Sequence, residues 1–143
     1  MLNGQGGVCS DFSEMFNLFC LINDIPVKEW GCVDQLYQTQ FGHSFNEIYS
    51  TQKQKWIAID VHKGILFKDS IGNYLSTLEL FRSLRAGSEL HLEHYSDYRS
   101  PKIERLNFVY AAQTIPFLVD NRHFKYISNC FRKYEKTYPK PLI

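Results

Sequence analysis

The clearest periodic pattern in the chain lies between Cys9 and Asn23. Apolar residues recur there every three or four positions, and two further leucines widen the apolar surface. The residues concerned are Phe12, Met15, Phe16, Leu18, Phe19, Leu21 and Ile22. This period is that of an α-helix. Asn23-Asp24 followed by Pro26 predicts the end of the helix. We therefore expect a largely buried helix with Cys9 in its first turn.

The pattern changes after this helix from a period of three or four to a period of two. Residues 27–33 fit a short strand, and the polar residues 34–42 fit a loop. Residues 43–49 and 55–61 both alternate, with a polar stretch between them, which is the pattern of a β-hairpin.

A second helix start is marked by Ser76 and Glu79, which form the S-x-x-E pattern of a capping box. Gly87 is placed to end that helix. Beyond Gly87 the pattern is weaker: residues 90–95 alternate in part, and residues 103–117 fit either a strand or a helix. Asp120 is placed to cap a final amphipathic helix.

Length and composition favour a single domain over residues 1–143. A chain of 143 residues is long enough to bury most of the surface of a single core. Its hydrophobic residues (44%) and charged residues (22%) occur in proportions ordinary for a globular protein. We find no repeat, no low-complexity stretch and no domain boundary. Helices and strands that do not alternate regularly indicate an α+β domain.

The net charge and the cysteine spacing limit which partners and cofactors are to be expected. The net charge of +1 gives no bias toward nucleic acid or membrane surfaces, and no apolar run is long enough to span a membrane. The four cysteines form no C-x-x-C pair, so neither a zinc site nor a disulfide framework is indicated. Without that pattern or a signal peptide, a cytoplasmic location is favoured. We expect no metal and no organic cofactor.

Cys9 is the first candidate for chemistry. A thiol is a nucleophile only as the thiolate, and a helix N-terminus stabilises that anion through free N–H groups and the helix dipole. A single cysteine is more often a small buried hydrophobic residue. The hypothesis therefore depends on partners elsewhere in the chain.

The predicted hairpin supplies those partners. If its turn consists of residues 50–53, His43 lies directly opposite Asp60. Opposed side chains on one sheet face have Cβ atoms about 4.5–5.5 Å apart, so a hydrogen bond can form. The carboxylate would then orient the imidazole beside a nucleophile. A slip of one residue would place Asp60 on the other face.

Taken together, the segments around Cys9, His43 and Asp60 resemble the transglutaminase-like superfamily of papain-related thiol enzymes. Residues 7–12 (Gly-Val-Cys-Ser-Asp-Phe) resemble its nucleophile segment, residues 43–49 its histidine strand and residues 55–60 its aspartate strand. The order of Cys9, His43 and Asp60 also fits. The resemblance covers residues 4–60, under half of the chain.

The resemblance implies a papain/transglutaminase-like core, with the N-terminal helix that carries the cysteine packed on an antiparallel sheet. It implies a Cys9, His43 and Asp60 triad that performs acyl transfer or amide hydrolysis through a thioester, with transferase, protease, deamidase or amidase outcomes open. The expected partner is a protein, a peptide or a small amide substrate. The oligomeric state stays open.

The chain also departs from the family. Only eight residues precede Cys9, where the family has further helical structure, so either the domain is truncated at its N-terminus or its C-terminal half completes the core. Val61-His62 follows Asp60 where the family often has Pro-Thr. These departures leave a second function open, that of an inactive member which binds a peptide or glycan in its cleft.

Three further residues are candidates for the oxyanion site or the cleft. Gln5 is a candidate for a side-chain amide donor. Trp56 and Glu47 share the predicted hairpin face, where Trp56 is a cleft wall and Glu47 an orienting group. For each of the three, an ordinary loop, packing or solvation role is an equal or better reading.

Other histidines offer weaker alternatives. His62 lies two residues beyond Asp60 and could replace His43 as the base, although a cross-strand partner is better opposed. His91 and His94 form H-x-x-H rather than the H-E-x-x-H of zinc enzymes, so a metal role is not expected.

Overall fold

The computed structural model describes residues 7–35, 38–95, 110 and 116–119. Within them the chain forms two helices and a six-stranded antiparallel sheet, which confirms the α+β class. In chain order the elements are α1 (Cys9–Ile22), β1 (Val27–Gln35), β2 (Gln38–Ser50), β3 (Lys55–Asp60), β4 (Ile65–Asp69), α2 (Thr77–Arg85), β5 (Leu90–His94) and β6 (Phe117–Leu118).

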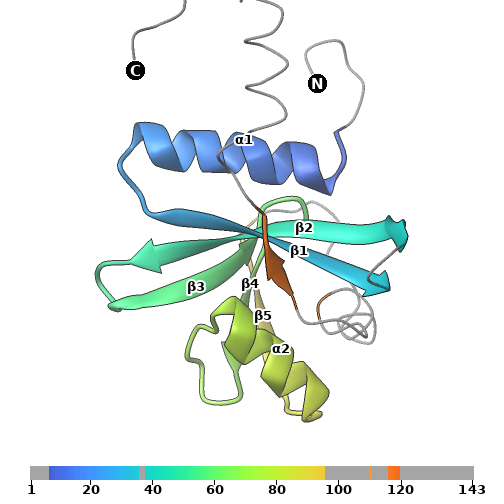
Figure 1. Cartoon of the computed structure of the whole chain (residues 1–143). Helices are drawn as coiled ribbons and strands as arrows, with labels where there is room; N and C mark the ends of the chain where they lie inside the picture. Colours follow the sequence, from blue (N-terminus) through green and yellow to red (C-terminus); the bar gives the residue numbers. More distant parts are fainter. Residues whose placement is uncertain (1–6, 36–37, 96–109, 111–115, 120–143) are drawn as a thin grey trace, which may run out of the picture.

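The sheet has the strand order β5-β4-β3-β2-β1-β6. Strands β1 to β4 each pair with the next strand in the chain, and β6 returns to cover the free edge of β1. Figure 1 shows α1 along one side of the sheet and α2 on the other. The first five strands therefore form a meander with a helix on each face.

The main hydrophobic core lies on the α2 face. Trp30, Phe45 and Phe67 point from three strands toward Leu80 and Leu84 of α2, and all five are buried. The predicted capping box places α2 correctly: Ser76 is the N-cap, its hydroxyl accepts from the Glu79 N–H, and the helix ends before a glycine with φ of +69°.

On the opposite face of the sheet, polar contacts hold α1 against β1 and β2. Asn17 Nδ2 donates to Glu29 Oε2 (2.9 Å), and Asn46 Nδ2 donates to Asn17 Oδ1 (2.8 Å) and to the Ser13 carbonyl (3.1 Å). These four residues are buried.

The prediction of a largely buried apolar helix is therefore wrong for α1. Its outward residues include Phe19, Leu21 and Ile22, each more than half exposed. The sheet side of α1 can be polar because its buried amides and the Glu29 carboxylate bond one another.

The hairpin prediction was right in its turn length but wrong in its register. Tyr49 pairs with Trp56 rather than with Gln54, and the four-residue turn is 51–54. In the observed register the Tyr49 and Trp56 rings meet with centroids 5.5 Å apart, a favourable cross-strand pair. The displacement is two residues, so each side chain keeps its predicted face.

One other expectation is corrected. The polar stretch 34–42 is not a loop, because β1 continues to Gln35 and β2 begins at Gln38. The alternation noted over residues 90–95 corresponds to the edge strand β5, Leu90–His94. Of the segment 103–117, the structure describes Tyr110, Pro116 and Phe117, and the predicted final helix after Asp120 lies outside the described residues.

Candidate active site

Cys9 is the first residue of α1, with Val8 as the N-cap. The Val8 N–H donates to Asp11 Oδ2 (2.8 Å), which closes the first turn as in a capping box. The Cys9 thiol is free and half-buried. The sulfur thus lies where unpaired N–H groups and the helix dipole favour an anion.

His43 lies beside this thiol. Burial alone would raise the pKa of Cys9, but a hydrogen bond with the His43 side chain, backbone N–H bonds from Ser44 and Ser10, and the imidazolium charge hold the pKa below its ordinary value of 9.0. In contrast, burial raises the pKa of Cys20, and it raises that of Cys32 to about 12. Of these three thiols, Cys9 is the one set up to ionise.

The other side of the His43 ring is held by Asp60. His43 Nε2 is hydrogen-bonded to Asp60 Oδ2, which leaves Nδ1 for the Cys9 sulfur. Burial alone would lower the pKa of His43, but its bonds to Asp60 and Cys9 raise the pKa to about 9. His43 therefore lies between the Cys9 thiol and the Asp60 carboxylate and interacts with both.

Strand register explains how His43 reaches Asp60. The β2–β3 ladder ends at the pair Asn46 and Ile59, so Asp60 falls next to Phe45, and His43 lies two residues further along the same face. His43 is therefore the diagonal neighbour of Asp60 rather than its direct partner. A diagonal pair is within reach of a long side chain such as histidine.

The Asp60 carboxylate is fully buried and surrounded by donors. Besides His43, Oδ2 accepts from the Tyr110 hydroxyl (2.6 Å), and Oδ1 accepts from the Lys63 N–H (2.9 Å). Burial alone would raise the pKa of Asp60, yet these bonds and the imidazolium charge hold it below its ordinary value. The carboxylate can therefore stay ionised inside the protein.

Tyr110 is the site residue that the sequence did not indicate. Its side chain is 1% exposed, and its ring meets His43 edge-on, with centroids 5.5 Å apart. It also meets Phe45 and Phe67 edge-on. Because Tyr110 is 50 residues from Asp60 in the chain, no local pattern could have linked the two residues.

Glu47 lies elsewhere in the molecule. Its buried carboxylate accepts from the Thr77 N–H at the start of α2 (2.8 Å) and from Trp30 Nε1 (3.1 Å), and it pairs with Lys28 (3.4 Å). The structure thus shows Glu47 capping α2 rather than orienting His43.

Trp56 also lies apart from the three central residues. It pairs with Tyr49 near the hairpin turn, and Lys28 Nζ lies 3.6 Å above its ring. Gln5 lies outside the described residues. The alternative base His62 packs against Phe12 (5.0 Å between centroids), and its centroid is 6.3 Å from that of His43.

A pocket of about 500 Å³ opens beside the Cys9 sulfur. It lies between the start of α1, strands β1 and β2, and the edge strand β6. Its lining residues are Val8, Cys9, Ser10, Gly31, Cys32, Gly42, His43, Ser44, Phe117 and Val119. Both Cys9 and His43 therefore face a space that can hold a small ligand.

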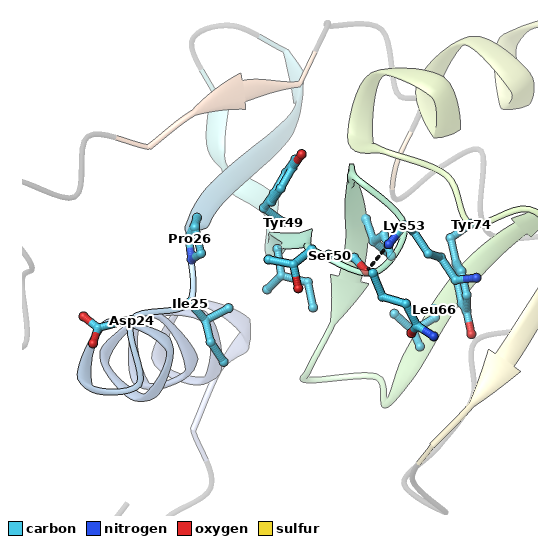
Figure 2. A pocket seen from close by; sticks show the side chains of 12 residues that line it. Asp24, Ile25, Pro26, Tyr49, Ser50, Lys53, Leu66 and Tyr74 are labelled. Carbon is cyan, nitrogen blue, oxygen red and sulfur yellow. Dashed lines mark hydrogen bonds between the residues drawn. The ribbon is translucent and has the colours of Figure 1, made fainter.

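A second pocket, of about 470 Å³, lies near the β2–β3 turn. Figure 2 shows Ile25 and Pro26 on one side of it and Lys53 and Tyr74 on the other. Among its described lining residues there is no cysteine or histidine. Of these two pockets, the first is the one lined by a cysteine and a histidine.

Comparisons with known proteins returned no family model, no curated protein and no solved structure that matches this chain. Across the described ranges, no helix is long and apolar enough to cross a membrane, and no three His, Cys, Asp or Glu side chains are grouped as metal ligands.

Proposed function

We propose that this chain is a thiol-dependent acyl-transfer enzyme or amide hydrolase of the transglutaminase-like, papain-related type. The observation that carries the proposal is the placement of His43 between the Cys9 thiol and the Asp60 carboxylate, with Cys9 and His43 lining one pocket. A nucleophile, a base and an orienting group in this order are the components of covalent acyl transfer.

Each group has a defined task in the reaction. His43 holds the Cys9 proton, so the thiolate can attack a carboxamide or peptide carbonyl and form a C–S bond. The imidazolium then protonates the leaving amine as the C–N bond breaks. An amine or a water molecule resolves the thioester, which makes the protein a transferase or a hydrolase.

Backbone donors support the same reaction. The backbone N–H groups of Ser10 and Ser44 lower the pKa of the Cys9 thiol, so they act on the reacting centre. Donors placed there can also stabilise the oxyanion of a tetrahedral intermediate, an effect of about 2.7–4 kcal/mol for one donor in other enzymes.

The fold around the site supports the family assignment within this proposal. The cysteine begins a helix that packs on an antiparallel sheet, and adjacent strands carry the histidine and the aspartate. This is the arrangement that the resemblance of residues 4–60 implies. The papain-related core is part of the proposal.

The proposal is tested by trapping the thioester. The protein is incubated with p-nitrophenyl acetate, and its intact mass is measured before and after treatment with neutral hydroxylamine, which cleaves thioesters. We expect one acetyl group on Cys9, lost on treatment and absent from the Cys9→Ala variant. Cys20→Ala is the matched control, because that thiol is buried, and it should acetylate like the unmodified chain.

An inactive binding module would give a different result. Cys9 would then acetylate no faster than a free thiol such as N-acetylcysteine at the same pH. That outcome would remove the enzymatic proposal and leave the pocket as a binding site.

A further inference from the structure

The pocket beside Cys9 has an uncharged lining apart from the catalytic groups. Among the described residues that line it, His43 is the only one with an acidic or basic side chain. Gly31 and Gly42 contribute backbone alone, and Val8, Phe117 and Val119 contribute apolar walls. Away from Cys9 and His43, a charged group placed here would lose its hydration without gaining a charged partner.

Phe117 forms the aromatic wall of this pocket. It pairs with Gly31 across β6 and β1, and a Cβ atom on Gly31 would lie only 2.6 Å from Phe117 Cζ. The ring therefore lies directly on the β1 backbone, and the absence of a side chain at Gly31 makes room for it. Phe117 is still 45% exposed, so part of its ring is free to contact a ligand.

The next residue on β6 provides a comparison. Leu118 is 56% exposed, and its side chain alternates to the other face of the strand. The pocket is lined by Phe117 and Val119, on either side of it. Loss of the Leu118 side chain would remove similar apolar surface from the same short strand without changing the pocket wall.

We propose that this pocket selects substrates whose acyl group carries an uncharged apolar or aromatic substituent, held against Phe117. This inference rests on the proposed function and adds the substrate class to it. In the first step the C–S bond to Cys9 forms, the bond from the carbonyl carbon to the leaving amine breaks, and the His43 proton goes to the amine. The substituent stays on the carbonyl carbon and occupies the pocket. A volume of about 500 Å³ is ample for one phenyl-bearing acyl group.

The test compares three p-nitrophenyl esters: the acetate, the 3-phenylpropanoate and the hemiadipate, which carries a carboxylate too far from the ester to attack it. In each, the C–S bond forms and p-nitrophenolate leaves, so the released phenolate and the mass added to Cys9 report the same step. Each rate constant is divided by that of N-acetylcysteine with the same ester. After this correction we expect the phenylpropanoate to react at least about tenfold faster than the hemiadipate.

Two variants locate the selectivity. Phe117→Ala should slow acylation by the phenylpropanoate about tenfold and change the acetate rate less than about twofold, because acetate does not reach the wall. Leu118→Ala should leave both rates unchanged. The comparison among esters with the unmodified chain stands even if a variant folds poorly.

The outcomes separate this inference from the function on which it rests. If no ester acylates Cys9 faster than N-acetylcysteine reacts, both are overturned. If Cys9 is acylated rapidly but the corrected phenylpropanoate and hemiadipate rates are equal, only the substrate class is overturned. If Phe117→Ala and Leu118→Ala slowed acylation by the phenylpropanoate equally, the assignment of Phe117 as the pocket wall would also be contradicted.

Discussion

The Asp60 carboxylate stays ionised without solvent because His43, Tyr110 and the Lys63 N–H surround it. A buried charge with this many donors polarises each of its partners. At His43 the effect is a pKa of about 9, and through His43 it extends to the Cys9 sulfur. The reactivity of the Cys9 thiol therefore depends on the contacts of Asp60, which act on the sulfur through His43.

Replacing Asp60 tests this dependence. Asp60→Asn keeps the shape and can still accept from the Lys63 N–H, but it removes the charge that holds the imidazolium. We expect the pKa of His43 to fall and that of Cys9 to rise. The acylation rate at pH 6 should then drop about 10²-fold or more. Stopped-flow measurement with p-nitrophenyl acetate checks this, and an unchanged rate would mean that Asp60 does not support the base.

Tyr110 is expected to act as a positioning residue through Asp60. Tyr110→Phe keeps the ring contacts with His43 but removes the donor to Oδ2, a bond to a charged group of about 1.5–3 kcal/mol. The pKa of Asp60 should rise, the imidazolium should lose support, and the pH midpoint of Cys9 alkylation should move upward.

Tyr95→Phe is the matched control for Tyr110→Phe. The Tyr95 hydroxyl donates to the backbone carbonyl of Asp60 (3.1 Å) rather than to its carboxylate. Its loss should leave the midpoint of Cys9 alkylation in place. Equal shifts in the two variants would indicate a general loosening around Asp60 instead of a specific bond.

At the scale of elements, α1 is fixed to the sheet by a buried carboxylate. Burial and the charge of Glu14 raise the pKa of Glu29 to about 7, and the Asn17 hydrogen bond offsets only part of this rise. The folded state therefore binds the proton more tightly than the unfolded chain does. The free energy of unfolding should fall as pH increases from about 4.5 to 7, and the loss should be complete above that range.

Glu29→Gln isolates this effect. Gln keeps an oxygen that can accept from Asn17, and it cannot ionise. At pH 8 we expect its Tm to exceed that of the unmodified chain by about 5 °C, and at pH 5 we expect the two to agree closely. Thermal unfolding followed by circular dichroism checks both values. A constant difference across this range would show that Glu29 does not titrate there.

A second carboxylate fixes α2. Glu47→Ala would leave the buried Thr77 N–H and Trp30 Nε1 without their acceptor, and we expect a loss of about 2–5 kcal/mol in urea unfolding. Glu47→Gln keeps one acceptor oxygen and should lose less. If Glu47→Ala changed the free energy of unfolding little but slowed acylation of Cys9 strongly, a role in the site would be favoured over capping of α2.

Element boundaries follow from the sequence wherever a local rule applies. The start of α1 at Cys9 and the box of Ser76 and Glu79 are examples. No local rule decides the register of the β2–β3 hairpin, because four-residue turns at 50–53 and at 51–54 fit the sequence equally well. The pairing of Tyr49 with Trp56 and the space that Ala58 leaves beside Glu47 favour the observed register. Since the two registers differ by two residues, His43 and Asp60 share a face in both.

At the scale of the whole molecule, the candidate site draws on six separate segments. They are the start of α1, the first half of β2, the end of β3, the part of β1 that lines the pocket, the segment that contains Tyr110 and the edge strand β6. The first three could be predicted from motifs and alternation. Tyr110 and Phe117 could not, because they reach the site only through tertiary packing. The same holds for the polar side of α1, whose buried amides need partners on two strands.

A site assembled in this way should disappear together with the fold. In a urea titration we expect the low-pH reactivity of Cys9 to be lost at the same midpoint as the fluorescence of the buried Trp30, as in a two-state transition. Alkylation rates at pH 6 and emission spectra on the same samples check this. Reactivity that persists beyond the fluorescence midpoint would show that the helix start alone activates the thiol.

The most direct test of the central claim is the pH profile of iodoacetamide alkylation, resolved for each cysteine by peptide mass spectrometry. The interaction of Cys9 with His43, which Asp60 holds, predicts that Cys9 reacts well below the pH at which ordinary thiols do, while Cys20 and Cys32 stay unreactive. It also predicts that His43→Gln moves the Cys9 profile upward to that of an ordinary thiol. A Cys9 profile that already matches an ordinary thiol, or that is unchanged in His43→Gln, would contradict the account.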